Sequence, residues 1–204
     1  MNFCDYFCGG MTKEIKNIDE DVAAALEVLK RGGVILYPTD TVWGIGCDAT
    51  RSEAVKRIFE IKKRADSKAM IVLVDSAERI DRYVEEVPDV ALQLIDVAVR
   101  PTTIVYDGAR NVARELVADD GSIGIRVTTD EFSQKLCRAL RRPLVSTSAN
   151  VSGEPTARFF SEISDEIKSA VDYIATTRRN DTTPSQPSCV IKVSSGGVIK
   201  ILRK

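Results

Sequence analysis

Short apolar runs alternate with amphipathic helical stretches along most of this chain. Runs such as 34–38 (VILYP) and 70–74 (MIVLV) have the length and composition of buried strands. Between them, stretches such as 19–31 and 130–142 repeat their apolar residues at helical spacing. This alternation predicts an α/β fold in which helices flank a mixed parallel and antiparallel sheet. The 204 residues are enough for a single domain of this kind with a substantial core.

Histidine is absent from the sequence, which removes the commonest general base and the commonest metal ligand. Any catalysis must therefore use carboxylates, Lys and Arg side chains, hydroxyls, backbone donors or a metal ion held by oxygens. The net charge of −1 argues against a protein that coats nucleic acid or an anionic membrane, although a local basic patch is compatible with it.

The five cysteines are scattered and show no CxxC spacing, which is typical of reduced thiols in a cytosolic protein. No apolar run is long enough for a membrane helix, and the N-terminus lacks the pattern of a signal peptide. We therefore expect a soluble, cytoplasmic protein with no membrane partner. Residues 1–14 are expected to form a loosely attached leader and residues 15–204 the folded domain.

A run of small polar residues follows the apolar strand at Leu144 and Val145. Five hydroxyl residues occur within eleven positions, together with an amide: Ser146, Thr147, Ser148, Asn150, Ser152 and Thr156. A turn needs one or two such residues, whereas this run offers many short hydrogen-bonding groups with little bulk. The pattern favours a cradle for phosphate oxygens or a nucleotide.

Residues 37–50 join a predicted strand to a predicted helix, where α/β folds commonly bind ligands. Within them, residues 44–49 fit the pattern G-x-G-x-x-A. In a dinucleotide site the glycines follow the strand directly, but here residues 38–43 intervene, so we reject NAD binding. We expect these glycines to form a tight strand-to-helix turn.

Two places in the sequence, the polar run at residues 39–41 and the single residue Arg126, allow two interpretations each. Thr39, Asp40 and Thr41 stand at a strand end, where they could bind a small polar ligand or cap their own turn. Arg126 lies in an apolar strand, where an unpaired guanidinium would be costly. It needs an anionic partner, which could be an acidic residue of the core or the carboxylate of a substrate.

A basic cluster ends the helix predicted over residues 50–64, and it consists of Lys62, Lys63, Arg64 and Lys68. Cations at a helix C-terminus interact favourably with the helix dipole, so the cluster need not bind anything. The functional alternative is a phosphate clamp with Arg64 as a bidentate fork. Two further groupings of Arg with hydroxyls, at 122–126 and 146–158, favour the clamp. The Arg pairs 141–142 and 178–179 are expected to be solvated.

Four segments, in this order and spacing, resemble the YrdC-type domain of L-threonylcarbamoyladenylate synthases. They are YPTDTVWGIGCDA, IFEIKKRADSKAMIVLV, GIRV and STSANVSGEPT. The resemblance runs from about Ile18 to Arg203 and fits the short, single-domain form of the family. It implies a twisted sheet with an open basic cavity. It also implies a reaction that joins L-threonine, bicarbonate or CO2, and ATP into threonylcarbamoyl-AMP and pyrophosphate. A downstream complex then uses this product to modify tRNA.

The resemblance assigns roles to residues that match the family motifs. Lys62 and Arg64 would be catalytic. Threonine binding would fall to Thr39, Thr41, Arg126 and Ser146. ATP binding would fall to Lys62, Arg64, Lys68, Ser122, Ser148, Asn150, Thr156 and Arg203. Mg2+ would arrive on ATP, with no metal site in the protein itself, and contact with tRNA or double-stranded RNA is a further possibility in this family.

Some positions depart from the family pattern. Trp43 replaces a tyrosine, Ala65 a proline and Leu73 a histidine that is tied to threonine binding, while residues 99–105 replace a Trp-Pro-Gly-Pro stretch.

Two rival functions remain open. One rival is a module that binds double-stranded RNA. The other is a YciO-type paralogue without synthase activity. Such paralogues lose the Lys-x-Arg and Ser-x-Asn elements, which this chain keeps at 62–64 and 148–150.

Overall fold

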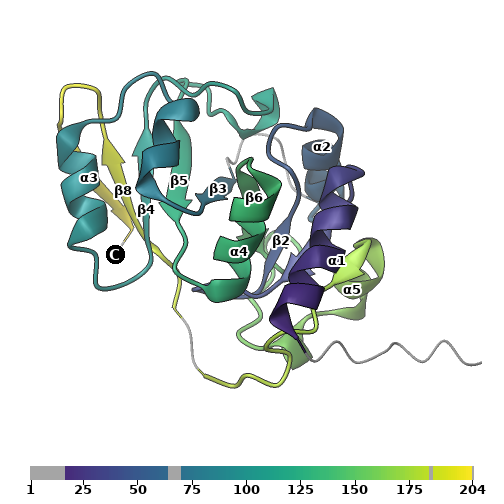
Figure 1. Cartoon of the computed structure of the whole chain (residues 1–204). Coiled ribbons are helices and arrows are strands. Elements are labelled where there is room, and N and C mark those ends of the chain that lie inside the picture. Colours follow the sequence, from purple (N-terminus) through teal and green to yellow (C-terminus); the bar gives the residue numbers. More distant parts are fainter. Residues whose placement is uncertain (1–16, 64–69, 184–185, 204) are drawn as a thin grey trace, which may run out of the picture.

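The computed structural model describes residues 17–63, 70–183 and 186–203, and they form nine strands. The strands are β1 (Ile35–Tyr37), β2 (Gly44–Gly46), β3 (Ile71–Val74), β4 (Thr102–Tyr106), β5 (Ile123–Val127), β6 (Leu144–Ser148), β7 (Tyr173–Ile174), β8 (Cys189–Val193) and β9 (Ile199–Arg203). They build one sheet in the order β7-β1-β2-β6-β3-β5-β4-β8-β9 (Figure 1). Neighbours are parallel at β7–β1, β3–β5 and β4–β8 and antiparallel elsewhere. This confirms the predicted single α/β domain with a mixed sheet.

Helices flank the sheet, and most of them begin where the sequence predicts. They are α1 (Ile18–Lys30), α2 (Ser52–Ile61), α3 (Asp89–Asp96), α4 (Glu131–Leu140) and α5 (Asp165–Ala170), with 3-10 turns η1 (Ala77–Arg82), η2 (Arg114–Leu116) and η3 (Phe160–Glu162). Helices α1 and α4 lie side by side (Figure 1). Within the described residues, no helix has both the length and the apolar character needed to cross a membrane. The predicted leader, residues 1–14, lies outside the described part of the chain.

Helix α1 is joined to the far edge of the sheet by one buried carboxylate. Val22, Ala25 and Leu29 form its buried stripe, and Asp21 is buried beside them. Asp21 accepts hydrogen bonds from the Tyr173 hydroxyl at 2.5 Å and from the backbone and hydroxyl of Thr177 at 2.7 and 2.5 Å. Burial alone would raise the pKa of Asp21, but these bonds outweigh it and hold the pKa below its ordinary value.

The glycines of residues 44–49 serve a different purpose from the one expected. Gly44 and Gly46 lie in β2, in the middle of an antiparallel ladder between β1 and β6, and not in a strand-to-helix turn. A Cβ on Gly46 would come within 2.3 Å of the Val145 carbonyl oxygen and 2.7 Å of the Tyr37 ring. Glycine is therefore required here by the close approach of neighbouring strands.

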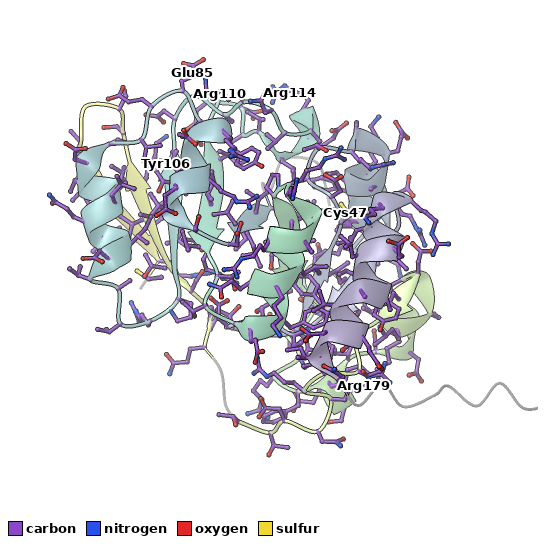
Figure 2. The ribbon with its side chains drawn as sticks, viewed as in Figure 1. Cys47, Glu85, Tyr106, Arg110, Arg114 and Arg179 are labelled. Carbon is purple, nitrogen blue, oxygen red and sulfur yellow. The ribbon has the colours of Figure 1, made fainter. Side chains whose placement is uncertain are left out.

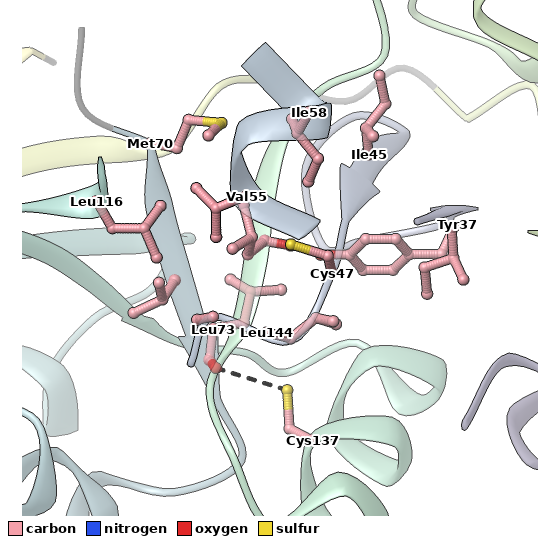
Figure 3. Packing of buried hydrophobic residues seen from close by; sticks show 14 of the residues in the cluster. Tyr37, Ile45, Cys47, Val55, Ile58, Met70, Leu73, Leu116, Cys137 and Leu144 are labelled. Atoms are coloured by element: carbon pink, nitrogen blue, oxygen red, sulfur yellow. Dashed lines mark hydrogen bonds between the residues drawn. The ribbon is translucent and has the colours of Figure 1, made fainter. Parts of the chain in front are cut away.

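The core surrounds the middle of the sheet. Leu73 and Leu144 are fully buried and stand opposite each other on β3 and β6 (Figure 3). Cys137 of α4 donates its thiol hydrogen to the Leu73 carbonyl at 3.6 Å. Burial raises the pKa of the Cys137 thiol, which keeps it protonated and unreactive. Leu73 is thus a core residue in this chain, and its partner on β5 is Arg126.

Candidate functional site

A cavity of about 230 Å³ opens on one face of the central strands. It is lined by Thr41, Val42, Gly44, Met70, Ile71, Arg126, Ser146, Thr147, Ser148, Thr156, Pro187, Ser188 and Arg203. The strand register explains much of this set. Ser148 pairs with Gly44, and Ser146 pairs with Ile71. Because paired residues and residues two apart share a face of a sheet, their side chains converge on one surface.

Six predicted site residues line this cavity together. They are Thr41, Arg126, Ser146, Ser148, Thr156 and Arg203. Among the residues that the structure describes, its lining contains two arginines and no acidic residue. Arg64 and Lys68 lie outside the described residues. Met70, which follows that segment, is one of the lining residues.

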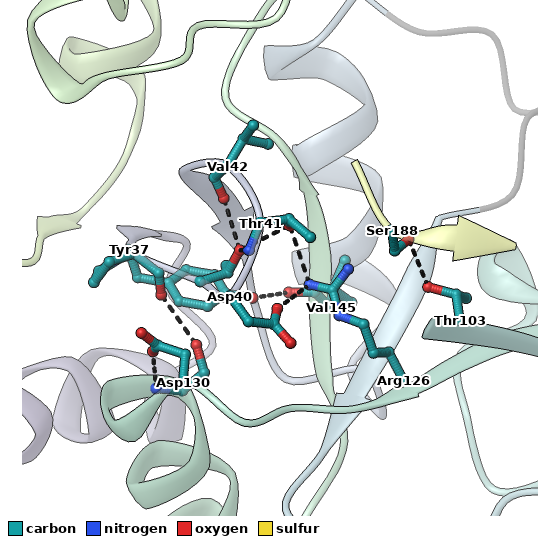
Figure 4. Close-up of polar contacts among 12 residues, drawn as sticks. Tyr37, Asp40, Thr41, Val42, Thr103, Arg126, Asp130, Val145 and Ser188 are labelled. Carbon is teal, nitrogen blue, oxygen red and sulfur yellow. Dashed lines mark hydrogen bonds and ion pairs between the residues drawn. The ribbon is translucent and has the colours of Figure 1, made fainter. Parts of the chain in front are cut away.

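Arg126, one of the lining residues, forms a buried ion pair with Asp40 (Figure 4). Its Nη2 atom lies 2.8 Å from Oδ1 of Asp40, and the two side chains are only 2% and 6% exposed. Burial raises the pKa of Asp40 and Arg126 opposes that shift, while burial lowers the pKa of Arg126 and Asp40 opposes it. An acidic residue of the core is therefore one partner of Arg126, which still lines the cavity.

A chain of hydroxyls runs from Arg126 back into the loop after β1 (Figure 4). Nη2 of Arg126 donates to Thr41 Oγ1 at 3.3 Å, and the two threonine hydroxyls of Thr39 and Thr41 are 3.0 Å apart. Thr39 donates its hydrogen to the Val42 carbonyl at 2.7 Å, so Thr41 must be the donor to Thr39. Thr41 consequently keeps one free lone pair and can only accept a hydrogen bond from a ligand.

Thr39 is fully used by its own loop. Its hydroxyl oxygen accepts from both the hydroxyl and the backbone nitrogen of Thr41 and donates to Val42. One hydrogen and two lone pairs are the whole capacity of a hydroxyl. The turn-capping interpretation therefore describes the contacts of Thr39, while Thr41 faces the cavity.

Lys62 lies under the serine-rich loop after β6. Its side chain is buried, and Nζ donates to the carbonyl oxygens of Ser148 and, at 2.7 Å, of Asn150. The Lys62 carbonyl in turn accepts the backbone N–H of Ser152 at 2.9 Å. These contacts join the end of α2 to the loop that carries Ser148.

Two other predicted ATP contacts stand outside the cavity lining. The amide nitrogen of Asn150 donates to the carbonyls of Val151 and Glu154, at 3.0 and 2.8 Å. Ser122 donates its hydroxyl hydrogen to Asp120 at 2.5 Å, and Lys192 pairs with the same carboxylate at 2.7 Å. Asn150 thus closes its own loop, and Ser122 is part of a polar cluster before β5.

Sequence reasoning missed the part played by two residues beside the cavity, Asp40 and Ser188. Asp40 was noted only as part of a polar run. Ser188 lines the cavity and its hydroxyl lies 2.9 Å from that of Thr103 (Figure 4). Arg203 donates to the Ser188 carbonyl at 3.0 Å and to its hydroxyl at 3.2 Å. The sequence signal for Ser188 was a hydroxyl residue directly before an apolar strand. Thr39 and Thr41 carry a similar signal, because they follow the end of an apolar strand.

Arg141, Arg142 and Arg178 are exposed, which confirms the prediction that they are solvated, whereas Arg179 is partly buried. Arg142, Arg178 and Arg179 also donate to acceptors within the protein. Arg178 donates to the Thr39 carbonyl at 3.0 Å and pairs with Asp130 at 2.7 Å. It therefore links the loop after β1 to the start of α4. Arg179, which is labelled in Figure 2, donates to the carbonyl oxygens of residues 174 and 175. Arg142 pairs with buried Asp48 at 2.8 Å. The guanidinium groups of these three arginines bind acceptors that cannot be predicted from their spacing in the sequence.

Asp40 also borders a second cavity of about 280 Å³, between the end of α3 and β5. Its other walls include Ile95, Val99, Pro101 and Val127. Among the described residues, no group of three or more His, Cys, Asp or Glu side chains is placed to hold a metal ion.

Comparison with known proteins identifies the family. A family model described as "Telomere recombination" and named for Sua5, YciO and YrdC matches residues 27–204. The chain belongs to the Sua5/YciO/YrdC family. It is 32% identical to a threonylcarbamoyl-AMP synthase of Pseudoalteromonas translucida, over 88% of this chain and 96% of that protein. It is 33% identical to the protein of the same name from Escherichia coli, over 83% of this chain and 92% of that protein.

Two solved structures of the Sua5/YciO/YrdC family share the fold. Escherichia coli YciO superposes with a TM-score of 0.79 at 27% identity, covering 92% of this chain and 90% of that one. Pyrococcus abyssi Sua5 in complex with L-threonine superposes with a TM-score of 0.74 at 26% identity. That match covers 84% of this chain but only 50% of the Sua5 chain, so this protein spans about half the length of that relative.

Proposed function

We propose that this protein is an L-threonylcarbamoyladenylate synthase, which forms threonylcarbamoyl-AMP and pyrophosphate from L-threonine, bicarbonate or CO2, and ATP. The observation that carries the proposal is the convergence of six motif residues from distant segments on one cavity. Relatives that match nearly end to end bear the name of this activity. We also propose that residues 15–204 form the catalytic domain.

In the proposed complex, L-threonine binds at the Arg126 end of the cavity. The buried guanidinium receives the substrate carboxylate, because a carboxylate is the natural partner of an arginine fork. The free lone pair of Thr41 accepts a hydrogen bond from the ammonium or hydroxyl group of threonine. Ser146, on the neighbouring strand, contributes a further hydroxyl.

ATP occupies the other end, near Ser148, Thr156 and Arg203. Arg64, Lys68 and Lys62 are proposed to favour pyrophosphate departure, and Lys62 also holds the loop that carries Ser148. Ser122 and Asn150 are proposed nucleotide contacts as well. We expect Mg2+ to enter on the phosphate oxygens of ATP, because this ion keeps several waters and needs few protein ligands.

The proposed chemistry needs no histidine. The threonine amine loses a proton and forms a C–N bond with CO2, giving a carbamate. A carbamate oxygen then attacks the α-phosphorus of ATP, the bond from that phosphorus to the bridging oxygen breaks, and pyrophosphate leaves. Such a transfer depends mainly on positioning and on neutralising charge. A carboxylate-binding arginine, hydroxyl donors and cations suit both tasks.

Transfer of labelled carbon from bicarbonate into a nucleotide product tests this proposal. With ATP, Mg2+ and L-threonine, we expect a labelled product with the mass of threonylcarbamoyl-AMP. The matched control is Arg126→Gln, which keeps the nucleotide end of the cavity and should lose threonine-dependent labelling. Wild-type protein that binds ATP but forms no labelled product would contradict the proposal.

The likeness to YciO in fold and identity favours one alternative, a nucleotide- or RNA-binding protein without synthase activity. This alternative predicts ATP or double-stranded RNA binding with no threonine dependence. RNA binding through phosphates would weaken steeply as the salt concentration rises. The downstream tRNA-modifying complex is a proposed partner only if labelled product forms.

A further inference from the structure

We propose that Asp40 makes the amino-acid end of the cavity selective for a zwitterion, that is, for a free α-amino acid over a simple carboxylic acid. The inference rests on the proposed function and adds a specificity-determining residue to it. Asp40 acts through its charge on Arg126 and on the ligand, and it is not itself a lining residue of the first cavity.

The two charges form a compact and nearly dry pair. The side chain of Arg126 is 2% exposed and that of Asp40 is 6% exposed, with 2.8 Å between Nη2 and Oδ1. Charges in such surroundings are poorly screened by water and salt. The pair as a whole carries no net charge. The net charge of a ligand that binds at Arg126 therefore strongly affects its affinity.

A ligand with a single negative charge fits the pair badly. Its carboxylate would share one arginine with Asp40, and two carboxylates would then repel each other around one buried cation. A zwitterion brings its own ammonium group, which offsets the charge of Asp40. Pair and ligand together then hold two positive and two negative charges.

The hydroxyl of Thr41 contacts the same guanidinium nitrogen of Arg126 as Asp40 does, and it lines the cavity. Nη2 of Arg126 is shared between Asp40 Oδ1 at 2.8 Å and Thr41 Oγ1 at 3.3 Å. Because its hydrogen is committed to Thr39, Thr41 offers only an acceptor to the cavity. An acceptor and a nearby negative charge both favour an ammonium group, and neither favours a second anion.

Binding of two ligands to three proteins tests the proposal. Calorimetry would give dissociation constants for L-threonine and for 3-hydroxybutyrate, which keeps the carboxylate and the hydroxyl but lacks the amine. The proteins are wild type, Asp40→Asn and Asp130→Asn. Asp130 is the matched control, because it lies behind the same loop but pairs with Arg178 and not with Arg126.

Wild type should prefer L-threonine, and Asp40→Asn should reduce that preference at least about tenfold, because the charge that the ammonium offsets is gone. Binding of 3-hydroxybutyrate should stay level or tighten, and Asp130→Asn should keep the wild-type preference. If Asp40→Asn weakens both ligands equally, Asp40 only supports Arg126 and the inference is overturned. Wild type that binds no threonine would overturn the proposed function itself. If Asp40→Asn does not fold by circular dichroism, Asp40→Ser removes the same charge with a smaller side chain.

Discussion

Arg126 shows most directly what the sequence predicts about the site and what only the structure reveals. An arginine in an apolar strand predicts an anionic partner, and sequence alone leaves two kinds of partner open. The structure shows Asp40 as a partner within the protein, and the buried Arg126 still lines the cavity. The pairing could not be read from spacing, because Asp40 lies in the loop after β1 and Arg126 lies in β5, which is not a neighbour of β1 in the sheet.

The Arg126–Asp40 pair should be visible in stability measurements. Arg126→Met should lower the free energy of unfolding by about 3–5 kcal/mol, because it leaves a buried carboxylate without its counter-charge. Adding Asp40→Asn should restore part of that loss, so that the double variant is more stable than Arg126→Met alone. Urea denaturation of the two single variants and the double variant measures the coupling. Strictly additive losses would show that the two side chains do not interact.

Lys62 offers a second test at the scale of one side chain. Lys62→Ala removes a buried ammonium that donates to the Ser148 and Asn150 carbonyls, so we expect a loss of about 2–3 kcal/mol in unfolding free energy together with weaker ATP binding. Thermal denaturation and ATP titration measure the two effects. Lys63→Ala is the control, since that neighbour is exposed and pairs with Glu166. Unchanged stability in Lys62→Ala would mean that the loop does not depend on this lysine.

At the scale of elements, β2 shows how a correct motif can receive the wrong explanation. The glycines at 44 and 46 were expected in a turn, but they lie in a strand whose neighbours leave no room for a side chain. Helices with a continuous apolar stripe, such as α1 and α4, were predicted well because the stripe itself sets their length. Close approach between strands depends on tertiary packing, which a single sequence does not display.

Substitution of Gly46 should therefore be costly. Gly46→Ala places a Cβ within 2.3 Å of the Val145 carbonyl oxygen, so β2 or β6 must shift, and we expect a loss of about 3 kcal/mol. Gly196→Ala is the control, because no atom lies within 4 Å of the Cβ it would add. Equal melting temperatures for the two variants would contradict this account of β2.

The attachment of α1 to the edge of the sheet predicts a pH dependence. Because the folded pKa of Asp21 is lowered, its ionised form adds stability above the unfolded pKa near 3.8, and this contribution is lost as the pH falls through the folded pKa. Wild type should thus exceed Asp21→Asn in unfolding free energy most clearly above about pH 5, with the difference shrinking below about pH 4. Urea unfolding of both proteins across this range measures it. Asp19→Asn is the control, because Asp19 lies on the exposed side of the same helix.

For the whole molecule, the sequence predicts more of the chemistry than of the topology. Fold class and strand positions follow from apolar periodicity, and five of the six cavity residues from hydroxyl or arginine residues within strands or in the loops that follow them. Arg203 was assigned only through the family resemblance. Strand order does not follow, because β6 inserts between β2 and β3 across nearly a hundred residues of sequence. That insertion brings Ser146 and Ser148 beside Gly44 and Ile71, and so it creates the cavity.

Pyrophosphate release from ATP, measured with and without L-threonine in the presence of Mg2+ and bicarbonate, tests the central claim most directly. L-Serine is the control, since it differs from threonine by one methyl group. We predict release that depends on L-threonine and is weaker with L-serine. Release that is absent, or the same without any amino acid, would contradict the assignment of this cavity to threonylcarbamoyl-AMP synthesis.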